Sequence, residues 1–322
     1  MPVHILVTGG AGNIGSALVG GLAHDEDNLV VIADDFSTGN IAKIPIRKNI
    51  KYIKCNVNDY DDLSGIFFRH PFEFVFHYAA VVGVERTLAN PLLVLRDIQG
   101  IENILKLSKN TGVRRVYFSS SSEVYGEPFE LPQNEETTPL NSRLPYAIVK
   151  NLAEAYLRSY QQEYGLEYTI FRFFNTYGPN QSEDFVVPRF VRRALRGDDI
   201  TVYGDGSQTR TFCYVDDSID ACLATLELNK FVNDTVNIGS DAEFTILELA
   251  QKVVEIVGAG SRIVHAPALK EGDMARRLPD ITKMRALLGR PLITLHEGIA
   301  RLVDHYRSCS EPDPTFLRVS AD

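Results

Sequence analysis

The stretch TGGAGNIG, Thr8 to Gly15, decides the fold, because it places Gly9, Gly12 and Gly15 at regular three-residue spacing between a β-branched run and an amphipathic segment. Glycine permits a tight turn and a close approach of the backbone to a ligand. The free N–H groups at a helix N-terminus attract a pyrophosphate. The stretch therefore predicts a strand, a turn and a helix that hold a dinucleotide at Gly9, Gly12, Asn13, Ile14 and Gly15.

The alternation of strand and helix continues along the first half of the chain. Short apolar runs occupy residues 4–10, 28–35, 51–57, 72–80, 114–120 and 167–175, with amphipathic segments such as 13–25 and 101–112 between them. Apolar strands that alternate with helices predict a parallel sheet covered on both faces. We expect a doubly wound α/β (Rossmann) domain over residues 1–174, which also receives part of 212–240. Denser Gly, Pro and Asp turns beyond it indicate a smaller C-terminal substrate-binding lobe over 175–322.

The second predicted strand, NLVVIADD, ends in Asp34 and Asp35, some twenty residues beyond the glycines. A carboxylate at this point accepts hydrogen bonds from the adenosine ribose, and it would repel a 2′-phosphate. These residues favour NAD over NADP. The alternative is an ordinary turn after an acidic strand end.

A tyrosine and a lysine, Tyr146 and Lys150, are four residues apart in PYAIVKNLAEAY and share one face of a predicted helix. An ammonium beside a phenol stabilises the phenolate, so we expect Lys150 to lower the pKa of Tyr146 and make it a base. The serine run FSSSSE, 118–123, ends another strand, where ligands of doubly wound sheets collect. The alternative for the tyrosine and lysine is a solvated helix face.

Composition narrows the functional classes. The 322 residues carry a net charge of −9, which argues against a nucleic-acid partner. No apolar run approaches about 20 residues, so no membrane span is expected. The four cysteines are scattered, without the spacing of a disulfide framework or a zinc site, so we expect no metal. The N-terminus lacks the features of a signal peptide, and a cytoplasmic protein is expected.

The chain resembles the extended short-chain dehydrogenase/reductases that act on nucleotide sugars, which include UDP-glucose 4-epimerases and UDP-glucuronate decarboxylases. The resemblance covers nearly the whole chain through TGGAGNIG, VVIADD, HYAA, FSSSSEVYG, PYAIVK, RFFNTYGP, ITVYGDGSQTRTFCYVDD, VNIGS and RRLPDITK, in that order. It implies an NAD that is recycled within the enzyme and a sugar oxidised at C4 to a ketone. Tyr146 would take the O4 proton, Lys150 would support it and bind the nicotinamide ribose, and Ser121 would hydrogen-bond O4.

The same resemblance implies the remaining contacts. Further cofactor contacts are expected at Asn56, Val57, Ala79 and Ala80. A UDP-sugar is expected to meet Ser121, Ser122, Asn175, Val187, Tyr203, Arg210 and Arg277. Arginine binds diphosphate through two parallel hydrogen bonds, so Arg210 and Arg277 would clamp it, although either could instead be a surface residue. Two predicted helices, which carry IENILKLSKN (101–110) and NLAEAYLRSYQQ (151–162), resemble the pair that forms the family's dimer interface and imply a homodimer.

Glu123 is relevant to the reaction that follows oxidation of the sugar to its C4 ketone. The family's dehydratases and decarboxylases carry a glutamate two positions past the serine or threonine, as Ser121 and Glu123 do here. The alternative is that Glu123 caps a turn or faces solvent. The aspartate that often precedes this glutamate in dehydratases is Ser122.

Other departures from the family's pattern leave the reaction open. The arginine common after RFFNTYGP in proteins acting on glucuronates is Asn180, so a C6 carboxylate lacks an obvious partner, for which Arg86 and Arg143 are candidates. Asp97 stands where an asparagine is usual. Epimerisation, dehydration and decarboxylation all remain open, beside an enzyme that consumes NAD(H) and a non-catalytic NAD-binding protein.

Overall fold

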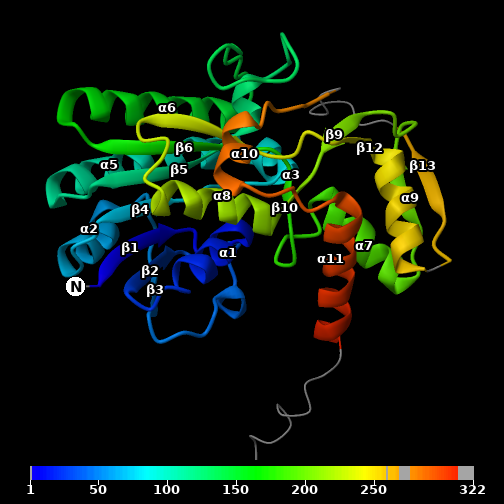
Figure 1. The fold of residues 1–322 in the computed structure, drawn as a ribbon, viewed down its shortest axis with the longest axis horizontal. Helices are drawn as coiled ribbons and strands as arrows, with labels where there is room; N and C mark the ends of the chain where they lie inside the picture. Colours follow the sequence, from blue (N-terminus) through cyan, green and yellow to red (C-terminus); the bar gives the residue numbers. More distant parts are fainter. Residues whose placement is uncertain (1, 259, 268–275, 311–322) are drawn as a thin grey trace, which may run out of the picture.

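A seven-stranded sheet, in which every neighbouring pair of strands is parallel, forms the centre of the larger part of the protein (Figure 1). The computed structural model describes residues 2–258, 260–267 and 276–310. Across the sheet the strands follow the order β11 (Asp234–Ile238), β6 (Glu167–Phe173), β5 (Arg115–Ser121), β4 (Phe74–His77), β1 (Val3–Thr8), β2 (Asn28–Asp34) and β3 (Ile50–Lys54). This confirms the predicted doubly wound Rossmann sheet.

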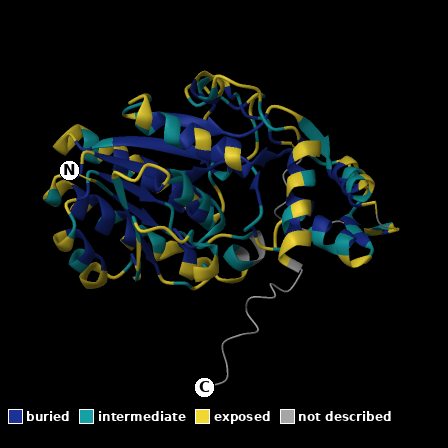
Figure 2. Cartoon of the chain, turned by 60° about the horizontal axis from the view of Figure 1, so that its bottom comes forward, coloured by how far each residue is buried: buried dark blue, intermediate teal, exposed yellow. Residues whose placement is uncertain are grey.

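Helices cover both faces of the sheet, because its central strands bury side chains on both sides. Successive residues of a strand point to opposite faces. Ile5 and Val7 of β1 belong to a core shared with α1 (Asn13–Leu22) and α8 (Val215–Glu227). Leu6 belongs to a second core, on the side of α2 (Tyr60–Arg69), α5 (Asp97–Thr111) and α6 (Pro145–Tyr164). The central strands are accordingly buried, and exposure is concentrated on outer helix faces and loops (Figure 2).

The strand order reverses at β1, which has β2 on one side and β4 on the other. At such a reversal the connections leave toward opposite faces, and a crevice opens beyond the carboxyl ends of the strands. β5 ends at the same edge, and the short 3₁₀ helix η2 (Ser122–Tyr125) follows it directly. The serine run and Glu123 are therefore placed at the mouth of this crevice.

The second lobe packs against the sheet domain through a continuous apolar core that includes α7 (Val186–Arg196), α9 (Ile246–Val257) and α11 (Leu295–Ser310). It also contains two strand pairs, β8 (Ile200–Tyr203) with β13 (Ile263–Ala266), and β9 (Thr209–Thr211) with β12 (Glu243–Thr245). β11 and α8 come from this half of the chain, yet they extend and cover the sheet. The boundary near residue 175 stays a prediction.

The remaining elements are short. They are η1 (Ile41–Lys43), α3 (Val84–Ala89), α4 (Pro91–Leu95), β7 (Thr176–Tyr177), β10 (Cys213–Tyr214) and α10 (Thr282–Leu288). Within the described ranges, none of the helices combines the length and the apolar character that crossing a membrane requires.

Candidate active site

A cavity of about 990 Å³ runs along the carboxyl ends of the strands and into the second lobe. It brings together most of the side chains and glycines that the sequence predicted. Those lining it are Gly9, Gly12, Asn13, Ile14, Gly15, Asp34, Asp35, Asn56, Val57, Ala79, Ala80, Ser121, Ser122, Glu123, Tyr146, Lys150, Asn175, Val187 and Arg277. Its size and mixed lining suit a ligand of dinucleotide or nucleotide-sugar dimensions.

The glycine loop has the geometry of a phosphate cradle. Gly9 has φ +69°, and a Cβ on Gly15 would lie 2.1 Å from the carbonyl oxygen of Gly9, so neither position accepts a side chain without a backbone shift. The N-cap residue of α1 is Gly12, so no capping side chain accepts hydrogen bonds from the first N–H groups of the helix. These N–H groups are therefore open to an anionic group of a ligand, as a pyrophosphate would be.

Asp34 and Asp35 take different positions at the end of β2. The buried Asp34 carboxylate accepts hydrogen bonds from the N–H groups of Ala11, at 2.9 Å, and Phe36, at 2.8 Å. It therefore ties the glycine loop to the strand end as well as presenting negative charge to the cavity. The exposed Asp35 accepts from the N–H of Ser37. Together with the glycine cradle, the acidic strand end fits NAD.

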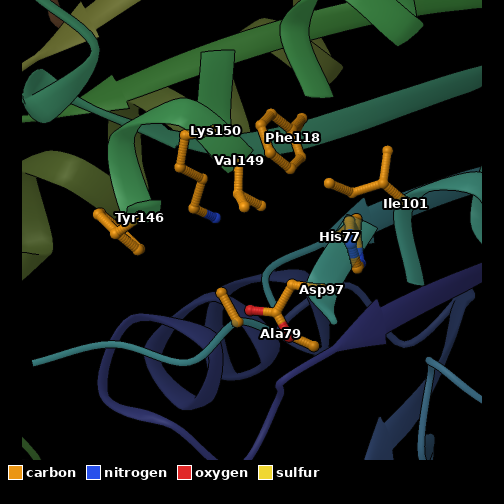
Figure 3. Close-up of a pocket in the computed structure, with 9 residues that line it drawn as sticks. His77, Ala79, Asp97, Ile101, Phe118, Tyr146, Val149 and Lys150 are labelled. Atoms are coloured by element: carbon orange, nitrogen blue, oxygen red, sulfur yellow. The ribbon is translucent and has the colours of Figure 1, made fainter. Parts of the chain in front are cut away.

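Tyr146 and Lys150 lie in the first turns of α6, which begins at Pro145, a residue well suited to the first helical position. The Lys150 Nζ donates to the Ser119 carbonyl oxygen at 2.6 Å and lies 5.7 Å from the centre of the Tyr146 ring. Figure 3 shows both side chains directed toward the same space. Burial lowers the pKa of Lys150 to about 8, while the charges of Asp97 and Glu154 oppose the shift.

The expected direction of the Tyr146 pKa is wrong for this structure. Burial raises the pKa of the phenol, the Ser121 hydroxyl opposes that rise, and the charge of Glu123 adds to it. The lysine ammonium donates to the Ser119 carbonyl, and its charge does not outweigh the desolvation of the phenolate. Helical spacing predicted the nearness of the two side chains correctly but carried no information about burial.

The four serines have separate contacts. Ser121 is the N-cap of η2, and its Oγ accepts from the N–H of Glu123 at 3.2 Å. Ser120 donates to the buried Glu154 at 2.6 Å, and Ser119 offers its carbonyl to Lys150. The Ser122 Oγ lies 3.4 Å from a guanidinium nitrogen of Arg277. The Ser121 hydroxyl also hydrogen-bonds with the Tyr146 side chain, and its contact with a sugar stays a prediction.

Glu123 neither caps the turn nor extends into solvent. Its carboxylate lies 2.7 Å from the Arg277 guanidinium, and both side chains are largely buried. The cap of η2 is supplied by Ser121 instead. Arg277, predicted to clamp a diphosphate, is therefore placed beside Glu123 and Ser122 in the same cavity as Tyr146.

Two predicted substrate contacts do not line the cavity. Tyr203 ends β8 and Arg210 lies in β9, on the strand pairs of the second lobe. The guanidinium of Arg210 donates to the carbonyl of its neighbour Thr209 at 2.7 Å. Asn175, by contrast, lines the cavity with φ +40° and donates to the Thr211 carbonyl.

The structure adds residues that sequence patterns did not assign to catalysis. His77 ends β4 and Asp97 begins α5, and both line a small cavity together with Lys150 and Tyr146 (Figure 3). Their place at strand and helix ends facing the crevice is the feature that could have identified them. Among the described residues, no group of histidine, cysteine and acidic side chains is arranged to hold a metal ion.

Comparison with known proteins gives relatives over almost the full length of the chain. UDP-glucuronic acid decarboxylase 6 of Arabidopsis thaliana is 35% identical over 95% of this chain and 89% of the relative. The UDP-N-acetyl-alpha-D-glucosaminuronate decarboxylase of Bacillus cytotoxicus is 35% identical over 95% of this chain and 98% of the relative.

Solved structures share the fold described above. The UDP-glucose 4-epimerase of Thermotoga maritima, solved with UDP-glucose, has a TM-score of 0.90 and 35% identity, over 96% of this chain and 100% of that one. The UDP-glucose 4-epimerase of Thermus thermophilus, solved with NAD, has a TM-score of 0.87 and 31% identity, over 95% and 99% of the two chains.

A family model matches residues 5–239, the region that contains the glycine loop, Asp34, Ser121, Tyr146 and Lys150. The match confirms the resemblance drawn from the sequence motifs and the expected use of NAD. The chain belongs to the NAD-dependent epimerase/dehydratase family.

Proposed function

We propose that this enzyme decarboxylates a UDP-linked hexuronate through a ketone at C4. The observation that carries the proposal is the Glu123–Arg277 ion pair, which borders the cavity shared by Ser121 and Tyr146. A guanidinium beside the sugar site offers a bidentate partner to a C6 carboxylate. The relatives named as decarboxylases of UDP-linked uronic acids support the same substrate class.

The first step needs the side chains at the end of β5 and the start of α6. Tyr146 is positioned to accept the O4 proton, with the Ser121 hydroxyl as a hydrogen-bond partner of O4. An NAD held by the glycine loop and Asp34 would supply the hydride acceptor at C4, the later return of that hydride, and the positive charge of an oxidised nicotinamide ring. A cationic group near Tyr146 would favour its phenolate, which burial disfavours by raising the pKa of the phenol.

The second step uses the ion pair. Oxidation at C4 places a ketone β to the C6 carboxylate, so the C5–C6 bond can break with loss of carbon dioxide. The bonding electrons pass into the C4–C5 enolate, and a proton is then added at C5. We assign the carboxylate contact to Arg277. When the substrate carboxylate takes its place at Arg277, the unpaired Glu123 carboxylate binds a proton from solvent and donates it to C5 after carbon dioxide leaves.

This arrangement agrees with the two positions, 180 and 122, at which the sequence departs from the family's pattern. Asn180 stands where an arginine was expected for glucuronates, and its amide donates to the Ser16 hydroxyl at 3.1 Å, at the glycine-loop helix. Arg277 supplies the missing cation from the opposite lobe. Dehydration is less well supported, because Ser122, in place of an aspartate, cannot act as the acid that expels a C6 hydroxyl.

A 4-epimerase is the second candidate. The likeness to the Thermotoga maritima epimerase favours it, and Ser121, Tyr146 and Lys150 would suffice for it. Product analysis separates the two: decarboxylation removes the mass of carbon dioxide from UDP-glucuronate, whereas epimerisation keeps the mass and inverts C4. An enzyme that consumes NAD(H) would instead change the amount of free NADH.

We further propose a homodimer formed through α4 and α6. These helices pack against each other and carry exposed apolar side chains, Leu92 and Leu95 on α4, and Ile148 and Leu152 on α6. An exposed apolar face of this kind marks an association surface. A cytoplasmic location is also proposed, since all four cysteines are unpaired, as expected in a reducing compartment.

A further inference from the structure

A second, small cavity branches from the active site beneath Lys150. Its volume is about 10 Å³, which is close to the space that one water molecule needs. The Lys150 ammonium and the Asp97 carboxylate both border it, from α6 and from the first residue of α5 (Figure 3). His77 and Tyr146 complete its polar lining.

The Asp97 carboxylate is held in place by neutral donors. Its Oδ2 accepts from the N–H of Val81 at 2.8 Å, and the side chain of Asn58 also donates to it. Neither contact neutralises its charge. The position at the start of α5 favours an anion as well.

The other charged and titratable groups around Lys150 are differently engaged. Glu154, on the same helix, lies 2.7 Å from the Arg172 guanidinium and 3.0 Å from that of Arg158, so its charge is matched by two arginines. His77, on β4, is neutral because burial lowers its pKa to about 3. Among the described groups around Lys150, Asp97 is therefore the anion whose charge the lysine ammonium compensates.

We propose that Asp97 is a positioning residue that keeps the Lys150 side chain positively charged, acting across the small cavity. An ammonium buried at 3% exposure loses much of its hydration, and a neighbouring carboxylate compensates for that loss. The charged lysine then stays available to Tyr146 over a wider range of pH. The inference concerns the Tyr146–Lys150 step and holds for epimerisation and decarboxylation alike.

The test is the titration of Lys150 in the NAD-bound protein, followed by NMR with ¹³Cε-labelled lysine. The Lys150 resonance is assigned by its loss in Lys150→Met. In Asp97→Asn, which keeps the acceptor for Val81 but removes the charge, we expect the titration midpoint to fall by about one pH unit or more. Glu255→Gln, which removes an exposed carboxylate in the second lobe, should leave the midpoint unchanged. An unchanged midpoint in Asp97→Asn would overturn the inference.

A measurement on the wild-type protein covers the case in which Asp97→Asn does not fold. Two coupled groups report on each other's titration. The carboxylate resonance of Asp97, labelled with ¹³Cγ-aspartate and assigned by its loss in Asp97→Glu, should step at the Lys150 midpoint. No step at that pH would show that the pair is not coupled. Neither readout depends on which sugar the enzyme converts, so failure here is distinct from failure of the proposed reaction.

Discussion

The Arg277 guanidinium lies 2.7 Å from the Glu123 carboxylate, in the cavity that also holds Ser121 and Tyr146. An ion pair between two largely buried side chains is held at a fixed place, and separating it leaves an uncompensated charge. A substrate carboxylate can replace Glu123 at Arg277, because one anion takes the place of another, and the displaced Glu123 carboxylate is neutralised by the proton that C5 later receives. This exchange is the physical basis for assigning a hexuronate to the site.

Glu123→Gln should lower turnover of UDP-glucuronate by roughly 10²- to 10⁴-fold, because it removes the group assigned to the C5 proton. Arg277→Gln should lower it at least as much, since the carboxylate loses its partner. Initial rates by product analysis measure both effects. Arg276→Gln is the matched control, because Arg276 pairs with Glu243 at the surface and should matter little. A full rate in Glu123→Gln would remove Glu123 from the mechanism.

Gly15→Ala should abolish retention of NAD. A Cβ at this position would lie 2.1 Å from the Gly9 carbonyl oxygen, so the loop must shift away from its cradle geometry. Gly20→Ala is the control on the same helix, where the Cβ would meet Pro45 at an ordinary 3.5 Å. It should retain NAD and gain up to about 1 kcal/mol of stability. Nucleotide released on denaturation measures the difference, and normal NAD content in Gly15→Ala would contradict the cradle.

His77 should make the fold sensitive to mild acid. Burial lowers its pKa to about 3, below the value of about 6.5 for an unfolded chain. Between these values the unfolded chain binds more protons, so stability from the neutral histidine is complete above pH 6.5 and is lost as pH falls toward 3. Between pH 7.5 and 5.5 this amounts to about 1.4 kcal/mol.

Denaturant unfolding at the two pH values measures the effect. His77→Asn should lose less stability on acidification than the wild type, even if it is less stable at both pH values. The exposed His24→Gln is the control and should follow the wild type. An equal loss in His77→Asn and wild type would show that His77 does not titrate as its burial requires.

Charged substitutions on α6 should split the proposed dimer. Ile148→Glu or Leu152→Glu places a carboxylate on the exposed apolar face, and burying it unpaired at an interface is unfavourable. Sedimentation velocity should show the mass halved in either variant. Leu228→Glu, at the end of α8 on the other side of the sheet, should leave the mass unchanged. A monomeric wild type would contradict the proposal directly.

Local patterns were enough to predict the parts of the site that lie close in sequence. The glycine loop with Asp34, and the helical pair Tyr146 and Lys150, depend on spacing within one or two elements. Contacts between distant segments were not predictable: Ser122 and Arg277 are 155 residues apart, and only the packing of the second lobe brings them together. Tyr203 and Arg210 are not among the residues that line the cavity, and their contact with a substrate stays a prediction.

Electrostatic properties were the least predictable. The spacing of Tyr146 and Lys150 suggested a lowered phenol pKa, but burial raises it, and burial depends on the whole fold. The role proposed for Asp97 depends in turn on Arg172 and Arg158, which engage Glu154. No single stretch of sequence contains these relationships.

Incubation of the NAD-bound enzyme with UDP-glucuronate, followed by mass spectrometry and proton NMR of the nucleotide sugar, tests the central claim most directly. Tyr146→Phe serves as the inactive control. We expect a UDP-pentose that has lost the mass of carbon dioxide, with no net formation of NADH. A product of unchanged mass with C4 inverted, or turnover of UDP-glucose but not of UDP-glucuronate, would contradict the account.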